Sequence, residues 1–155
     1  MLGGIMKKLI IIAAALVLSG CGAAGDKAEP IGRELDCTAE ITSGGYDYSA
    51  KIERTEAEDG AGAYNFTFTA PEGLAGVSVS LIGESCTLTL GDQSESIPLS
   101  ELPAHGMLLL FSEAAESAIN GEPEGKVRGI PYKAEAEDGK LKRLELGDGT
   151  SFELS

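Results

Sequence analysis

The sequence predicts an α+β fold in which a curved antiparallel β-sheet, forming an open half-barrel, is covered by one main helix. Two observations predict the sheet. Apolar and polar residues alternate in a series of short runs, and glycine-containing turns separate these runs at roughly ten-residue spacing. Such spacing is typical of an antiparallel meander. A third observation predicts the helix, because one later segment changes to a period of three to four residues.

The first strands follow from alternation on both sides of two tight turns. Apolar and polar residues alternate over residues 39–42, 46–53 and 64–70. Gly44-Gly45 and Asp59-Gly60 separate these runs, and both pairs tolerate the positive φ that a tight hairpin requires. We therefore expect three strands joined by two hairpin turns.

The same pattern continues to the end of the chain, with a break at residues 71–73 and another at the helix. Asp138-Gly139 and Asp148-Gly149 are natural hairpin turns for the last strands. The remaining strands are expected at residues 77–81, 86–90, near 97–99, and then at 130–137, 141–146 and 151–154.

The covering helix is predicted near residues 103–120. Pro103 can begin it, and Asn120-Gly121 provides a stop of the C-cap type. Residues 107–111 are apolar on all sides, so we expect the sheet to cover the start of the helix. The apolar residues at three-to-four spacing are Leu108, Phe111, Ala115 and Ile119.

The amino-terminal segment has the three parts of a secretion signal. Lys7 and Lys8 precede an uncharged apolar run over residues 9–18, and small residues then lead to Cys21. The sequence Leu18-Ser19-Gly20-Cys21 resembles the lipobox of bacterial lipoprotein signal peptides. This resemblance implies that the Cys21 thiol is acylated, for example with palmitate, and that the preceding bond is cut.

Other interpretations of this segment fit less well. A transmembrane helix needs about 20 apolar residues, and the two lysines interrupt the run near its start. A helix of a soluble domain would have a polar face, which residues 9–18 lack. An ordinary cleaved signal peptide is the remaining alternative. We therefore expect a signal peptide at 1–20, a flexible tether at 21–33 and a sheet domain at 34–155, anchored to the extracytoplasmic face of the cell membrane.

The charge of the chain restricts its partners. The formal net charge is −13, and removal of residues 1–20 takes away two lysines, which makes it −15. Such a surface repels phosphate backbones, so we expect no nucleic-acid partner. Anionic headgroups are repelled as well, so the lipid on Cys21 is expected to provide the affinity for the membrane. The sequence does not identify a protein partner.

Cys37 and Cys86 remain after Cys21 is assigned to the lipid. Two cysteines in an exported protein can form a disulfide bond. Each also lies within an alternating apolar segment, so buried free thiols are the alternative. A metal site is not expected, because structural zinc normally takes four protein ligands and the chain has a single histidine.

No catalytic residue and no cofactor are predicted. His105 is the one candidate for acid–base chemistry, but no patterned nucleophile accompanies it, and a solvated or capping role explains it. The chain also lacks the closely spaced oxygen ligands of a calcium loop and the glycine pattern of a phosphate-binding loop.

Aromatic residues gather on two consecutive predicted strands. An ordinary core explains this clustering. The alternative is a partly open apolar cavity beneath the helix, which is the usual form of a site for small molecules. The candidate lining residues are Tyr46, Tyr48, Tyr64, Phe66, Phe68, Leu108 and Phe111.

The strand-turn-strand run over residues 35–99, followed by one helix and closing hairpins, resembles the lipoprotein-carrier fold of the LolA/LolB type. The segment from Tyr64 to Leu74 looks like the aromatic strand and proline-containing break of that family. The resemblance implies a curved, unclosed sheet whose cavity holds acyl chains.

These observations favour a non-enzymatic, lipid-anchored binding module whose ligand is a hydrophobic small molecule or lipid. The alternative is a structural or protein-interaction lipoprotein with a filled core and no ligand. A hydrolase that uses His105 ranks last.

Overall fold

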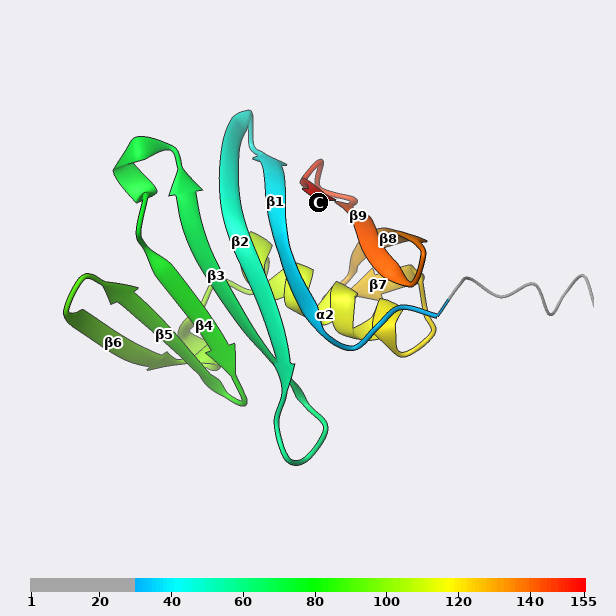
Figure 1. The fold of residues 1–155 in the computed structure, drawn as a ribbon, viewed down its shortest axis with the longest axis horizontal. Helices are drawn as coiled ribbons and strands as arrows, with labels where there is room; N and C mark the ends of the chain where they lie inside the picture. Colours follow the sequence, from blue (N-terminus) through cyan, green and yellow to red (C-terminus); the bar gives the residue numbers. More distant parts are fainter. Residues whose placement is uncertain (1–29) are drawn as a thin grey trace, which may run out of the picture.

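The computed structural model describes residues 30–155. Within this range one antiparallel sheet of ten strands is combined with one α-helix, and the sheet stays open (Figure 1). The predicted fold class is therefore confirmed. The predicted signal peptide, Cys21 and residues 22–29 of the predicted tether lie outside the described residues.

Ten strands and one α-helix account for most of the described chain, with two short 3-10 turns, η1 (Glu72–Leu74) and η2 (Leu99–Glu101). The α-helix is α2 (Met107–Ile119). The strands are β1 (Leu35–Ser43), β2 (Tyr46–Glu56), β3 (Gly62–Ala70), β4 (Ser78–Ile82), β5 (Ser85–Leu90), β6 (Gln93–Pro98), β7 (Glu124–Val127), β8 (Ile130–Glu137), β9 (Lys140–Leu146) and β10 (Ser151–Leu154).

Two meanders make up the sheet. The strand order is β6-β5-β4-β3-β2-β1-β10-β9-β8-β7, so the first and last strands of the chain are neighbours in its middle. Ala39 of β1 pairs with Leu154 of β10. The helix connects the two outer strands, β6 and β7, and crosses one face of the sheet between them (Figure 1).

The turns follow the sequence prediction. Gly44 and Gly45 have φ of +59° and +83°, a backbone conformation that residues with side chains rarely adopt. They join Ser43 and Tyr46, which pair directly across the hairpin. The strong twist of such a two-residue turn matches the twist of the strands that it connects.

Three details differ from the prediction. The helix begins at Met107, because the backbone N–H of Gly106 donates to the Pro103 carbonyl at 3.0 Å and residues 103–106 form a turn. Strand β7 was not predicted, since only Val127 of its four residues is buried and no alternation is visible. The domain also begins before residue 34, because Ile31 is buried against the core.

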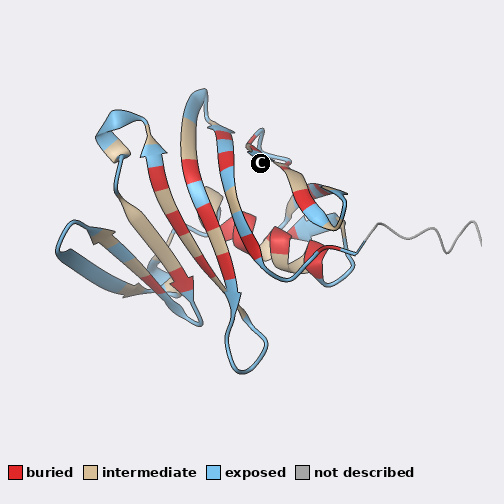
Figure 2. Cartoon of the chain, viewed as in Figure 1, coloured by how far each residue is buried: buried red, intermediate tan, exposed pale blue. Residues whose placement is uncertain are grey.

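The hydrophobic core lies between α2 and the middle of the sheet. Figure 2 shows buried residues concentrated in β1, β2, β3 and α2, whereas β6 is mostly exposed. Alternation places every second side chain on the face that bears the helix, which we call the covered face. The opposite face is polar, with hydroxyl pairs such as Thr87 and Ser96 at 2.8 Å between neighbouring strands.

Residues 30–155 thus contain a ten-stranded sheet and a hydrophobic core. These are the attributes of a domain that folds on its own.

Candidate ligand pocket

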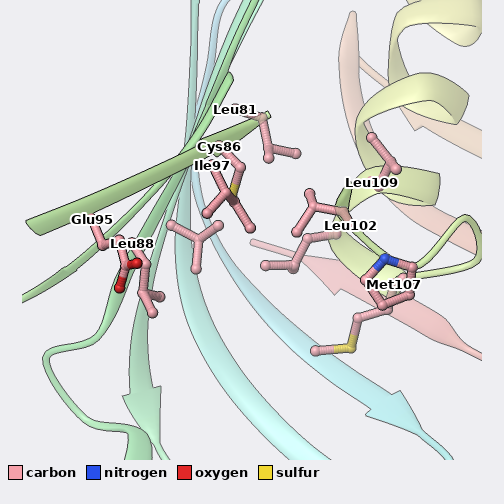
Figure 3. Close-up of a pocket in the computed structure, with 12 residues that line it drawn as sticks. Leu81, Cys86, Leu88, Glu95, Ile97, Leu102, Met107 and Leu109 are labelled. Carbon is pink, nitrogen blue, oxygen red and sulfur yellow. The ribbon is translucent and has the colours of Figure 1, made fainter. Parts of the chain in front are cut away.

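An apolar pocket of about 400 Å³ lies where the outer strands of the first meander meet the start of the helix (Figure 3). We call it the β4–β6 pocket. Its volume falls within the range of about 300–1,000 Å³ that is usual for small-molecule sites. Its lining residues are Val79, Leu81, Cys86, Leu88, Glu95, Ile97, Leu102, Pro103, Gly106, Met107, Leu108 and Leu109.

The sheet wall of the pocket consists of two rows that run across three strands. Strand register fixes both rows, since residues opposite each other on neighbouring strands share a face. Leu81, Cys86 and Ile97 are paired in one row. Val79, Leu88 and Glu95 are paired in the next row.

The other wall comes from the connection into the helix and the first turn of α2. Leu102 and Pro103 belong to the connection, and Met107 to Leu109 begin the helix. Figure 3 shows Leu102 and Leu109 facing the sheet residues Ile97 and Cys86 across the pocket. The helix start is apolar on all sides because one side packs on the core and another faces this pocket.

The lining is hydrophobic with one exception. Glu95 is the only ionisable carboxylate or amine among the lining residues. Leu88, its neighbour in the row, is 49% exposed, and Leu90 further along β5 is 58% exposed. Apolar surface therefore extends from the pocket to the solvent.

The predicted cavity residues fall in different places. Leu108 lines the β4–β6 pocket. Tyr46 is exposed at the β1–β2 hairpin, and Tyr48 is half-buried. The other four are buried in the core: Tyr64, Phe66, Phe68 and Phe111.

The centre beneath the helix is packed with aromatic rings. The ring centroid of Phe111 lies 4.5 Å from that of Phe152 and 5.8 Å from that of Phe66. Tyr64 meets Phe111 edge to face at 6.3 Å. These separations are typical of favourable aromatic contacts. The aromatic cluster therefore fills the core, as the simpler interpretation of the sequence holds, and the open apolar space lies beside it.

Sequence reasoning missed the sheet wall of the pocket. The alternation of residues 77–90 identified the strands but not which of their apolar residues the helix leaves uncovered. One signal was present in the sequence. A helix start that is apolar on all sides requires apolar surroundings on more than one side, and the strands preceding it in the chain provide them.

Cys37 and Cys86 are both free, so the possible disulfide between them is absent and the alternative of two free thiols holds. They lie on β1 and β5, with β2, β3 and β4 between. Neighbouring strands are about 4.8 Å apart, so the two cysteines are far beyond the reach of a disulfide bond. Burial raises the pKa of both thiols, and the Asp36 charge adds to this for Cys37. Cys86 serves as an apolar lining residue of the pocket.

A polar cluster joins α2 to strands β2 and β3. Arg54 of β2 is buried and donates through Nε and Nη2 to the two carboxylate oxygens of Glu116, at 2.7 and 2.6 Å. The Tyr64 hydroxyl donates to the same carboxylate at 2.6 Å. Arg54 also donates to the backbone carbonyl of Arg33.

The hydrogen bonds, charges and burial within this cluster shift the pKa values of Glu116 and Tyr64. Burial opposes the charge of Glu116, but hydrogen bonds from Arg54 and Tyr64 and the Arg54 charge outweigh this and lower its pKa. Burial, together with the hydrogen bond to Glu116, raises the pKa of Tyr64. The bidentate ion pair between Arg54 and Glu116 therefore stabilises the packing of α2 on the sheet.

His105 is exposed, and its Nε2 lies 3.2 Å from the Arg128 carbonyl oxygen. This contact joins the loop before α2 to the β7–β8 turn. Over residues 30–155, no group of three or more His, Cys, Asp or Glu is arranged to hold a metal ion. None of the helices in the same range is long and apolar enough to cross a membrane.

Comparison with family models, curated proteins and solved structures gives no match. The functional proposal therefore rests on the pocket geometry and on the sequence features.

Proposed function

We propose that this chain is an extracytoplasmic lipoprotein, anchored through a lipid on Cys21, that binds a hydrophobic ligand in the β4–β6 pocket without catalysing a reaction. The observation that carries the proposal is the pocket itself, whose lining is apolar apart from Glu95. A concave apolar surface is costly to leave in water, and a hydrophobic ligand relieves that cost.

The size of the pocket suits one short chain or ring system. A water molecule occupies about 30 Å³ in the liquid, and a methylene group is of similar size, so 400 Å³ holds on the order of a dozen carbon atoms. Each buried methylene contributes about 0.8 kcal/mol. A dozen methylenes therefore gain about 10 kcal/mol, and association costs at least about 4 kcal/mol, so at most about 6 kcal/mol remains, which corresponds to a dissociation constant on the order of 0.1 mM.

The predicted anchor supports the same function. A lipid on Cys21 keeps the domain close to a membrane, where hydrophobic molecules are concentrated. The resemblance to the LolA/LolB-type carriers, which hold acyl chains against a curved sheet, points the same way.

The binding test uses the mature chain, residues 21–155 with Cys21→Ser, which includes all described residues. The probe is the uncharged dye N-phenyl-1-naphthylamine, whose fluorescence rises in apolar surroundings. Val79→Trp places a large ring in the pocket, and Ile82→Trp puts the same ring on the opposite face of the same strand. Cooperative thermal unfolding of each variant confirms that it is folded.

The proposal predicts saturable dye binding by the parent chain and by Ile82→Trp, and at least about tenfold weaker binding by Val79→Trp. Leu88→Asp provides a second test, because it adds a charge to the pocket at a half-exposed position that tolerates it. Absence of saturable binding, or equal binding by all variants, would contradict the proposal.

The anchor is tested in cells with an alkynyl palmitate analogue. The full chain is expected to incorporate the label and to remain with the membrane fraction. Cys21→Ala is expected to lose both properties. Labelling that persists in Cys21→Ala would contradict the predicted site of attachment.

A second candidate function is protein interaction without a ligand. The packed aromatic core and the exposed Leu88 and Leu90 favour it, since exposed apolar patches mark interaction surfaces. It predicts that the mature chain fails to bind the dye and self-associates in sedimentation velocity, and that Leu90→Asp abolishes this association.

A further inference from the structure

We infer that the ligand of the β4–β6 pocket is a cationic amphiphile, an alkyl or aryl group that carries a protonated amine. This inference rests on the proposed function and specifies its ligand. It follows from the charges of the chain segment that forms the pocket, which are acidic and are not offset by lysine or arginine.

Glu95 supplies the charge at the pocket itself. It pairs with Leu88 across β5 and β6, so its side chain lies on the covered face with the apolar lining. Figure 3 shows Glu95 beside Leu88, at the end of the pocket away from Leu109. Glu95 is exposed, and its strand, β6, lies at the edge of the sheet. The carboxylate is therefore placed where a polar headgroup would meet water.

The chain segment that forms the pocket contains no lysine or arginine to offset this carboxylate. Residues 55–125, which include β3 to β6 and α2, contain twelve acidic residues and no lysine or arginine. All residues that line the pocket belong to this stretch. The local potential therefore attracts cations and repels anions.

A basic residue, Arg128, lies close to the pocket, because its backbone contacts His105 in the loop before α2. Its Nε donates to both carboxylate oxygens of Glu113, at 2.9 and 3.0 Å. Its backbone carbonyl, and not its guanidinium, meets His105. The charge of Arg128 is thus paired with Glu113, so we do not expect it to bind an anionic headgroup.

A cationic amphiphile fits this arrangement at both ends. Its apolar part enters between the two leucine-rich walls, and its ammonium group donates hydrogen bonds to the Glu95 carboxylate at the solvent side. The ammonium stays partly hydrated there, so little desolvation cost opposes binding. A fatty acid of the same length would place two carboxylates together, which is unfavourable.

The experiment compares three ligands with the same ten-carbon chain: decylamine, 1-decanol and decanoate. Each displaces N-phenyl-1-naphthylamine from residues 21–155 with Cys21→Ser at pH 7.5 and low salt. We expect decylamine to bind about three- to tenfold more tightly than decanol, and decanoate to bind more weakly than decanol. Added sodium chloride is expected to reduce these differences.

Two variants assign the preference to Glu95. Glu95→Gln is expected to bring the three affinities within about twofold of one another, and Glu95→Lys to make decanoate the preferred ligand. Glu84→Gln is the matched control, because it removes a carboxylate from the β4–β5 turn outside the pocket lining. It is expected to keep the preference for decylamine.

The outcomes separate the two proposals. If none of the three ligands displaces the dye and the dye itself does not bind, the proposed function fails. If all three bind equally, if decanoate binds best, or if Glu95→Gln keeps the full preference for decylamine, the pocket binds ligands but this inference is wrong.

Discussion

Arg54 of β2 and Glu116 of α2 form a bidentate ion pair, with both carboxylate oxygens accepting hydrogen bonds at 2.7 and 2.6 Å. The Arg54 side chain has no exposed surface, whereas that of Glu116 is 28% exposed. This pair fixes the helix on the covered face. Because α2 also forms one wall of the β4–β6 pocket, the pair helps to set the width of the pocket.

Loss of one partner of this pair is expected to destabilise the domain strongly. Glu116→Ala leaves a buried guanidinium without its carboxylate, and we expect the free energy of unfolding to fall by about 3 kcal/mol. Glu113→Ala on the same helix breaks an exposed pair with Arg128, at an expected cost of about 1 kcal/mol or less. Urea denaturation measures both, and equal losses would contradict the structural role assigned to Glu116.

The same carboxylate is expected to make stability depend on pH. The pKa of Glu116 in the folded state lies below its ordinary value of 4.5, so its contribution is fully present above that value. The contribution is lost as the pH falls through the folded-state pKa. We therefore expect the stability difference between the parent chain and Glu116→Gln to shrink between pH 5 and pH 3. A difference that stays constant over this range would show that Glu116 does not titrate as described.

Gly62 has a structural reason to lack a side chain. A Cβ at this position would lie 2.6 Å from Glu116 Oε2 and 2.8 Å from Arg54 Nε, so it would displace the ion pair. We expect Gly62→Ala to cost about 1–3 kcal/mol in thermal or urea unfolding. Gly73→Ala is the control, because a Cβ there meets no atom within 4 Å. Similar stabilities of the two variants would mean that the ion pair adjusts freely.

Both thiols of the sheet domain are expected to be free. Unfolding the chain in iodoacetamide without reductant should alkylate Cys37 and Cys86, as intact mass spectrometry can show. In the folded protein we expect slow alkylation, because burial raises the pKa of both thiols and limits access. A chain that takes up label only after reduction would contradict the strand order, which keeps β1 and β5 apart.

The sequence was sufficient to predict the sheet, because apolar alternation and glycine-containing turns are local signals. The Gly44-Gly45 hairpin and the runs on either side of it appear where they were predicted. The same signals could not show that β1 pairs with β10, since that contact joins distant segments. Strand β7 escaped prediction because its sequence, Glu124 to Val127, has a single buried residue.

The candidate site was predictable only in part. Leu108 was identified from its helical spacing, whereas the aromatic residues expected beside it pack against Phe152 and one another. Which apolar side chains stay uncovered depends on where α2 lies along the sheet. The turn at residues 103–106 is local, but the Arg54–Glu116 pair, which also holds α2 on the sheet, joins residues that are 62 positions apart in the chain.

Ligand binding in the β4–β6 pocket is tested most directly by a crystal structure of residues 21–155, with Cys21→Ser, grown with 1-decanol. This ligand is uncharged, so the result does not depend on the role of Glu95. We predict an alkyl chain between Leu81 and Ile97 on the sheet and Leu102 in the connection that precedes the helix. A pocket closed by its own side chains, with decanol absent from it, would contradict the proposed function.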